Sequence, residues 1–212
     1  MNVLDLTQRI TADMPVYPGT EKPQIIDATT IRKHGFAEKR LTFYSHTGTH
    51  MDAPGHILAG ATTLDGFDVS HFMGPGAVID VTGATEEIGK SRLTPYSDRV
   101  GRCDYALLHT GWDKKWADAS YFEGFPVLSE EAAAWLCGFR LKGIGIDCLS
   151  VDAVGNTALG NHRAILSSGM VIVENLCNLS ALIGRGFVFC CFPLNIVDAD
   201  GSPVRAVGCI DD

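Results

Sequence analysis

The chain lacks the features of several large protein classes. None of its apolar runs approaches the ~18 residues that a membrane-spanning helix requires. Lys and Arg form no basic stripe, and the net charge of −8 opposes binding to a phosphate backbone. We therefore expect neither a membrane span nor a nucleic-acid partner, which leaves small molecules as the expected ligands.

Two widespread catalytic signatures are missing as well. The sequence has no GxSxG nucleophile turn and no GxGxxG dinucleotide-binding loop. Residues 155–160 resemble the start of a phosphate-binding loop, but Asn161 and His162 stand where that loop requires Lys and Ser or Thr. Nucleotide binding is thus excluded, and a serine hydrolase is disfavoured.

Cysteine usage and the N-terminal segment bear on location. The seven Cys residues are odd in number and form no CxxC pair. Most of them, including Cys148 and Cys191, stand among apolar residues, where Cys behaves as a small hydrophobic side chain. The N-terminal segment has neither the basic start nor the apolar stretch of a signal peptide. These features predict core thiols and a cytoplasmic location.

The composition is that of a globular protein, with 46% hydrophobic and 20% charged residues and no visible linker or repeat. We expect one domain over residues 1–212. Short strand-like runs outnumber helices, which predicts an α/β class with layers around a mixed sheet. The expected strands cover residues 3–10, 24–31, 40–46, 77–81, 105–110, 144–149, 169–173, 187–192 and 204–210.

One helix is clearly indicated, over residues 129–139. Ser129 can cap its N-terminus, while Glu130 and Glu131 favour the positive end of the helix dipole. Gly138 can help to end it. Weaker helical segments are expected at residues 91–98, 160–168 and 178–183.

The most informative feature is the stretch HTGTHMDAPGH, residues 46–56, which holds three of the seven His residues. It is too rich in Gly and Pro for a helix. Gly48 allows a turn that brings His50 back beside His46. Asp52 falls on the same side as His50 if the backbone there is extended. Because imidazole and carboxylate suit Zn²⁺, Mn²⁺ and Fe²⁺, these three side chains are predicted to bind a divalent cation.

Three protein ligands leave a coordination position open for water, as in catalytic rather than structural sites. A bound cation lowers the pKa of such water to about 7 and so provides hydroxide as a nucleophile. His56 is then free as a general acid or base, because an unperturbed imidazole has a pKa of about 6.5. The isolated His34, His71 and His109 are expected to be surface or hydrogen-bonded structural residues.

Two further carboxylates, Asp147 and Asp152, lie in or just beyond the strand-like run at residues 144–149. Their spacing gives no geometric reason for them to converge as a catalytic pair. A buried, hydrogen-bonded Asp at the end of a strand is the expected role.

The histidine-rich stretch resembles the HxGTHxDxPxH signature of the metal-dependent cyclase family, which includes bacterial kynurenine formamidases and isatin hydrolase. Other similar segments are MPVYPG near the N-terminus, TGW at 110–112, GIDCLSVD at 145–152 and HRAILSSGMVIVENL at 162–176. They span almost the whole chain in the family's order. The central signature is highly specific, whereas TGW alone would mean little.

The resemblance implies roles for individual residues. His46, His50 and Asp52 match the ligands of a first metal, and His56 matches the family's catalytic histidine. In the two-metal formamidases the Asp bridges to a second ion, whose other ligands align with His162 and Glu174. The positions of His162 and Glu174 in the sequence are weak evidence by themselves, and an exposed His and a solvated Glu are the alternative.

The resemblance also implies a fold and an assembly. The fold is a layered β/β/α domain with a barrel-like mixed sheet and few helices. The assembly is a homodimer, for which aromatic loops such as residues 121–125 would suit an interface.

The substrate is less defined. Tyr17 stands where the kynurenine formamidases carry a Trp that stacks on the substrate's aromatic ring, so an aromatic face is kept but changed. Between Val16 and Pro18, Tyr17 can also simply pack.

Three functions stay open at this point. The first is an arylformamidase-like hydrolase, for example of N-formylkynurenine to kynurenine and formate in tryptophan catabolism. The second is another metal-dependent reaction, such as cyclisation, dehydration or isatin-like ring opening. The third is a metal- or ligand-binding protein without turnover, which would have no need of His56. Zn²⁺ is the first candidate metal, although Mn²⁺ and Fe²⁺ suit the same ligands, with one or two ions per subunit.

Overall fold

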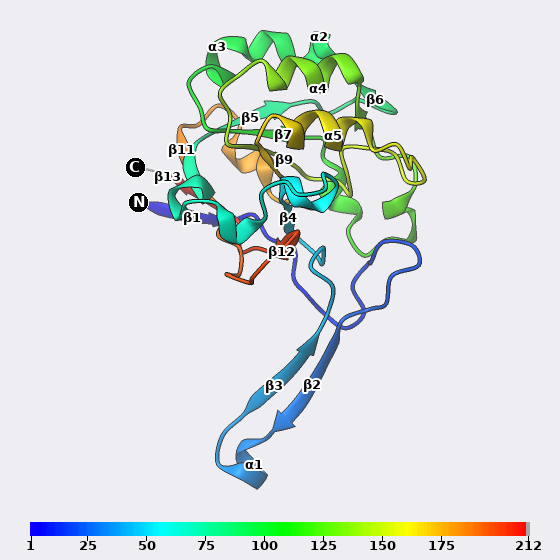
Figure 1. Ribbon diagram of the computed structural model, residues 1–212, viewed down its shortest axis with the longest axis vertical. Helices are drawn as coiled ribbons and strands as arrows, with labels where there is room; N and C mark the ends of the chain where they lie inside the picture. The colour runs from blue at the N-terminus through cyan, green and yellow to red at the C-terminus, as the bar shows by residue number, and fades with distance from the viewer. Residues whose placement is uncertain (211–212) are drawn as a thin grey trace.

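The computed structural model describes residues 1–210, and its main element is a mixed sheet that curls into a half-barrel (Figure 1). In order across this sheet the strands are β1 (Asn2–Asp5), β13 (Val207–Ile210), β11 (Phe187–Cys190), β5 (Met73–Asp80), β7 (Tyr105–His109), β9 (Gly143–Ile146), β10 (Val171–Glu174), β4 (His50–Asp52) and β12 (Gly201–Pro203). The strands from β5 to β10 are parallel, and the other pairs are antiparallel. This confirms the predicted α/β class with a barrel-like mixed sheet.

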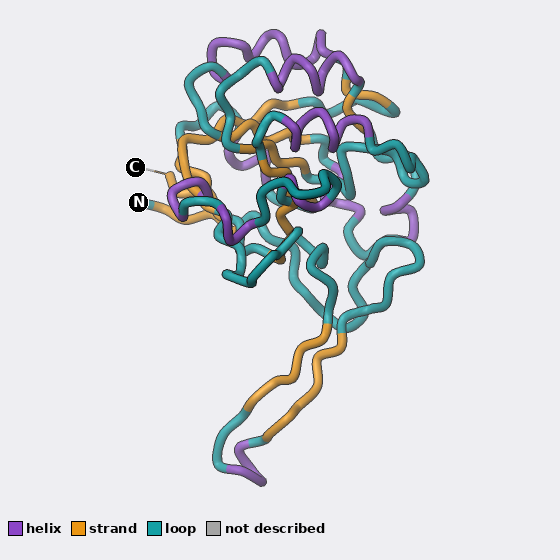
Figure 2. Tube along the Cα trace, viewed as in Figure 1, coloured by secondary structure: helices purple, strands orange, loops and turns teal. Residues whose placement is uncertain are grey.

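Four short helices cover one face of the sheet (Figure 2). They are α2 (Lys90–Leu93), α3 (Ser97–Val100), α4 (Glu130–Cys137) and α5 (Gly160–Ser167). Helix α4 begins as predicted, because the Ser129 hydroxyl accepts a hydrogen bond from the Ala132 N–H and two Glu residues follow. Among residues 1–210, no helix has the length and apolar character needed to cross a membrane.

Each face of the central strands packs against its own apolar cluster. Ala106 and Leu108 of β7 face the helices. Tyr105 and Leu107 point the other way, into a cluster that also holds side chains of β4 and β11. All residues of β7 are buried, as expected for a parallel strand covered on both faces. The second cluster therefore fills the inside of the curled sheet and supports β4 from behind.

A hairpin projects from this body (Figure 1). It consists of β2 (Gln24–Thr29), the short helix α1 (Ile31–His34) at the tip and β3 (Glu38–Thr42). Every residue of β3 is exposed, and no residue of α1 is buried. A separate small ladder pairs β6 (Glu87–Ile88) with β8 (Val127–Leu128).

Several predicted boundaries are wrong. The strand expected at 40–46 ends at Thr42, so His46 lies in a bend. The sequence pattern does not predict β4 or β12, because three residues are too few to show an alternation. The helix expected at 91–98 is divided by the 3₁₀ turn Thr94–Tyr96, where Pro95 interrupts the hydrogen bonding.

From the sequence, residues 121–125 are expected to suit a dimer interface. This is wrong for Tyr121 and Phe125, the aromatic residues at the two ends of the segment. Tyr121 and Phe125 are buried in the cluster beneath the helices. The Tyr121 hydroxyl donates a 2.6 Å hydrogen bond to Asn175 Oδ1, so this segment belongs to the interior.

Asp147 is a buried carboxylate directly after β9. It accepts hydrogen bonds from the Thr110 and Gly111 N–H groups, and its Oδ2 lies 2.9 Å from His109 Nδ1. This is the structural, hydrogen-bonded role expected from the sequence for both Asp147 and His109.

Replacing His109 by Gln is expected to change the pH dependence of unfolding. The hydrogen bond that His109 Nδ1 donates to Asp147 raises the pKa of His109, although burial opposes protonation. A His with a raised folded pKa stabilises the fold fully below its unfolded pKa of about 6.5, and this contribution is lost as the pH rises through the folded value. In urea titrations, the stability difference between wild type and variant should shrink as the pH rises from about 6 to 9.

The exposed His34 provides a matched control, since His34→Gln leaves the interior untouched. A difference between wild type and His109→Gln that stays constant across this pH range would contradict the assignment.

Candidate metal centre

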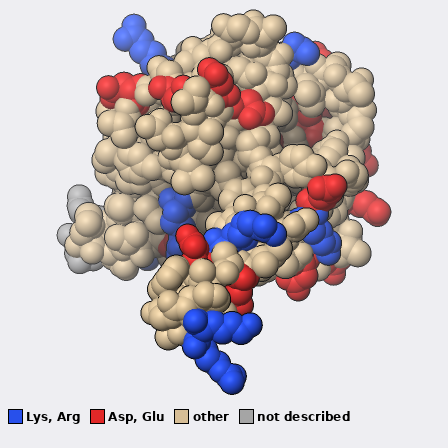
Figure 3. Space-filling view, turned by 60° about the horizontal axis from the view of Figure 1, so that its bottom comes forward, with Lys and Arg blue, Asp and Glu red and all other residues tan. Residues whose placement is uncertain are grey.

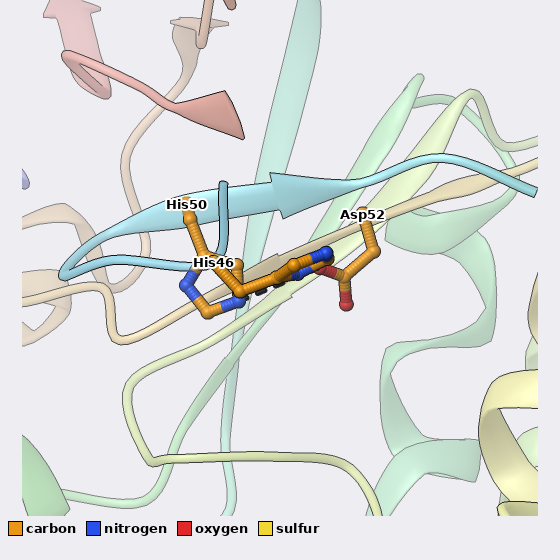
Figure 4. Close-up of side chains that lie close together, drawn as sticks. All are labelled: His46, His50 and Asp52. Carbon is orange, nitrogen blue, oxygen red and sulfur yellow. Dashed lines mark hydrogen bonds and ion pairs between the residues drawn. The ribbon is translucent and has the colours of Figure 1, made fainter. Parts of the chain in front are cut away.

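Strand β4 lies between β10 and β12 and carries two of the predicted ligands (Figure 4). His50 and Asp52 point to the same side of β4, whereas Met51 packs into the core behind it. Gly48 has φ +66°, a left-handed conformation that turns the chain so that His46 faces the strand. The expected turn therefore exists, and the three side chains meet.

The first donor triplet consists of His46, His50 and Asp52, whose ligand atoms all lie within 4.8 Å of one another. Asp52 Oδ1 is 2.7 Å from His46 Nδ1 and 3.4 Å from His50 Nε2. His50 and Asp52 are buried, while His46 keeps a partly exposed edge.

The second donor triplet consists of Asp52, His162 and Glu174. His162 Nε2 lies 3.6 Å from Asp52 Oδ2 and 3.3 Å from Glu174 Oε1. The register of β10 with β4 places Glu174 directly opposite His50, with Oε2 3.5 Å from His50 Nε2. Asp52 thus turns one oxygen to each triplet. Because His162 and Glu174 are both buried, the alternative of an exposed His and a solvated Glu is wrong.

Each imidazole of the two triplets has one ring nitrogen that faces the triplet and one that is hydrogen-bonded to an acceptor outside it. An acceptor at that nitrogen keeps the proton there and leaves the inner nitrogen with a lone pair for a cation. The acceptors are the Gly48 carbonyl for His50 (2.8 Å), Asp152 for His162 (2.7 Å) and Asp200 for His46 (2.9 Å). The residues present therefore fit a divalent cation with nitrogen and oxygen ligands.

The electrostatics of the centre favour positive charge. Burial opposes protonation of His46, but Asp52 and Asp200 outweigh it and raise the pKa of His46 to about 9. Burial likewise opposes protonation of His162, yet Asp152, Asp52 and Glu174 raise its pKa to about 12. The pKa of Asp52 is lowered well below its usual value by these imidazoles despite complete burial. A donor set of this kind suits a cation, which would replace the ring protons.

His56 belongs to neither of these two triplets, but it forms a third group of donors with His46 and Asp200, whose ligand atoms lie within 4.8 Å of one another. It ends the 3₁₀ turn Pro54–His56, and its ring lies 4.0 Å from that of His46. Burial lowers the pKa of His56, which the charge of Asp52 only partly offsets. Its imidazole is therefore neutral near pH 7 and able to accept a proton.

A pocket of about 520 Å³ opens over this centre, a volume that suits a small organic ligand. Its wall includes the aromatic side chains of Tyr17, Tyr44, Trp116, Tyr121 and Phe122. Tyr17 lies in that wall with about half of its surface exposed. Within residues 1–210, no Lys or Arg lines the pocket, and neither do His34, His71 and His109.

Sequence reasoning misses part of this site. Asp200 approaches His46 and His56 from the other end of the chain, and no local pattern pairs it with them. Tyr44, Trp116 and Phe122 carry no motif either. The only available signal is the Gly that follows Asp200, since a Gly beside a polar residue indicates a close backbone approach.

Comparison with known proteins supports one family throughout. The family model described as "Putative cyclase" matches residues 4–153. Kynurenine formamidase of Bacillus mycoides is 31% identical over 207 residues, which cover 96% of this chain and 95% of that protein. An uncharacterized protein of Methanocaldococcus jannaschii is 31% identical over 208 residues, 98% of each chain.

Solved structures share the fold. Isatin hydrolase A of Ralstonia solanacearum superimposes with a TM-score of 0.86 at 24% identity, over 99% of this chain and 92% of that one. A protein from Bacillus stearothermophilus described as a predicted metal-dependent hydrolase gives a TM-score of 0.81 at 27% identity, over 98% and 97%. These matches confirm the resemblance carried by HTGTHMDAPGH, and the chain belongs to the cyclase family, together with its kynurenine formamidase relatives.

Proposed function

We propose that this protein is a metal-dependent hydrolase that cleaves the amide bond of a small N-formyl or N-acyl aromatic amine. One observation carries the proposal: two donor triplets share Asp52 at the floor of an aromatic pocket, beside a histidine that belongs to neither. Relatives named as kynurenine formamidases and as metal-dependent hydrolases support a hydrolase of this type.

The first triplet would hold one cation and the second triplet another, with Zn²⁺ as the first candidate and Mn²⁺ or Fe²⁺ as alternatives. When bound, a divalent cation supplies Lewis acidity, which acidifies water and polarises a carbonyl oxygen. His56 takes a proton from the attacking water and returns it to the amide nitrogen as the C–N bond breaks. The products are a carboxylate, such as formate, and an aromatic amine.

The pocket walls favour an aromatic substrate. Tyr17 and Tyr44 lie at the rim and offer flat faces for an aryl ring. N-formylkynurenine is the first candidate, given the names of the relatives. Because no Lys or Arg of residues 1–210 lines the pocket, the carboxylate of the substrate's amino-acid group would find no cationic partner there. Simple formanilides are therefore candidates as well.

Ring opening of a neutral cyclic amide is the second candidate, and the same aromatic side chains, with no Lys or Arg of residues 1–210 beside them, favour it. Chromatography of the products separates the two, since ring opening gives one product and formanilide hydrolysis gives two. A binding protein without turnover is the third alternative. It predicts uptake of the cation with no hydrolysis of any amide offered.

Removal of metal is expected to abolish hydrolysis. Protein stripped with a chelator should be inactive on N-formylkynurenine, formanilide and isatin, and should regain activity when Zn²⁺, Mn²⁺ or Fe²⁺ is restored singly. The measurement is the initial rate for each substrate, with the metal content determined in parallel. Full activity in the stripped protein would overturn both catalytic alternatives.

We also propose a homodimer, with the projecting hairpin as its arm. An isolated two-stranded hairpin is at best marginally stable, so it needs a surface to pack against. Its tip exposes Ile31 and Phe36, at 72% and 57%. Residues 24–42 hold four Lys or Arg and two Asp or Glu, whereas the whole chain has a net charge of −8 (Figure 3). A basic arm on an acidic body is complementary to a second copy of the chain.

Replacing Phe36 by Ser is expected to weaken this dimer. Sedimentation should give wild type twice the chain mass of 22.8 kDa and shift the variant toward the monomer at low concentration. Val3, an exposed apolar residue of β1, provides the control variant Val3→Ser. A wild-type protein that sediments as a monomer would contradict the proposed homodimer.

A further inference from the structure

Asp200 places one carboxylate oxygen between two imidazoles of the site. It lies directly before β12, and its Oδ2 is 2.9 Å from His46 Nε2 and 3.4 Å from His56 Nδ1. The two rings lie against each other, with centroids 4.0 Å apart. The same oxygen therefore contacts a residue of the first donor triplet and the proposed acid–base residue.

The backbone holds this carboxylate in place. The Asp200 carbonyl accepts a 2.9 Å hydrogen bond from the Ala53 N–H, and Gly201 pairs with Asp52 across the β12–β4 ladder. A Cβ at Gly201 would lie 2.5 Å from His46 Cε1, so the glycine backbone touches the ring edge between its two nitrogens. The His46 ring is thus confined on one side by Gly201 and held at Nε2 by Asp200.

A carboxylate acceptor decides which ring nitrogen of a neutral imidazole carries the proton. At His46, a proton held on Nε2 leaves Nδ1 as the lone pair that faces Asp52, where a cation of the first triplet would bind. At His56, a proton held on Nδ1 leaves Nε2 as the acceptor. One oxygen thereby selects the useful tautomer of both rings.

We propose that Asp200 is a positioning residue that fixes the tautomer and orientation of His46 and His56 together. This inference rests on the proposed function, because it assigns His46 to the cation and His56 to proton transfer. It predicts two separable losses on removal of the carboxylate: weaker cation binding through His46, and a lower kcat at full cation loading through His56.

The test compares Asp200→Ala and Asp200→Asn with wild type. Asp200→Ala is expected to weaken Zn²⁺ binding about 10- to 100-fold in competition with a chromophoric chelator, as for other groups that orient a ligand. Its kcat at saturating Zn²⁺ should fall as well, with KM little changed. Asp200→Asn keeps an oxygen that accepts one hydrogen bond, so both losses should be smaller. In the Zn²⁺-loaded protein, imidazole ¹⁵N shifts should show a single His46 tautomer in wild type and its loss in Asp200→Ala.

Asp198→Asn is the matched control, an exposed carboxylate in the same loop at a positive φ that Asn tolerates. Zn²⁺ affinity, tautomer and kcat that are unchanged in Asp200→Ala would overturn the inference. A drop in melting temperature alone would do the same, since it would show a merely structural role. If the wild-type protein itself binds no Zn²⁺, the result would instead contradict the proposed function as a metal-dependent hydrolase.

Discussion

Replacing Asp52 by Asn is expected to abolish hydrolysis and to lower the number of bound cations. Asp52 joins the first and second donor triplets, with Oδ1 directed at His46 and Oδ2 at His162. Asn has the same shape but lacks the charge, so the change tests coordination rather than packing. We expect kcat/KM to fall by about 10³-fold or more, because a bound cation stabilises the transition state by several kcal/mol.

The measurement combines initial rates with metal analysis of the purified variant and with circular dichroism to check the fold. Asp98→Asn changes an exposed carboxylate of α3 and is the control for loss of a negative charge. An Asp52→Asn protein that keeps both its cations and its rate would show that the centre lies elsewhere.

The part of the site that is local in sequence could be predicted. Gly48 requires a left-handed conformation, and this turn alone brings His46 back to His50. The two-residue period of an extended backbone then places Asp52 beside His50. These are short-range rules, so eleven residues suffice to apply them.

The rest depends on contacts between distant segments. Glu174 faces His50 only because β10 and β4 pair in one particular register, and neither strand is long enough to reveal its partner in the sequence. Asp152 caps the first turn of α5, where its carboxylate accepts from the His162 N–H and also holds the His162 ring. Family resemblance, rather than spacing, supplies His162 and Glu174 as candidates.

The hairpin shows a different limit. Its two strands are visible in the sequence, but their alternation says nothing of whether they join the main sheet or leave it. In the structure β2 and β3 pair only with each other. The chain before β2 and after β3 forms the pocket wall with Tyr17 and Tyr44, so an arm docked on a second copy would also steady that wall.

Replacing His56 by Ala is expected to separate proton transfer from cation binding. His56 lines the pocket but lies outside both donor triplets, and its ring is 6.4 Å from that of His162. General acid–base catalysis contributes about 10²- to 10⁴-fold, so kcat should fall by that factor while the cation content stays that of wild type. Stopped assays at saturating substrate, with metal analysis of the same samples, measure both quantities.

His34→Ala is the control, since His34 lies at the tip of the hairpin, away from the pocket. The opposite pattern, full activity with a lost cation, would make His56 a ligand and would remove the acid–base role. The metal analysis decides between the two roles, because His56 also forms a group of donor atoms within 4.8 Å with His46 and Asp200. Burial lowers the pKa of His56, so its imidazole is neutral near pH 7, as a proton acceptor requires.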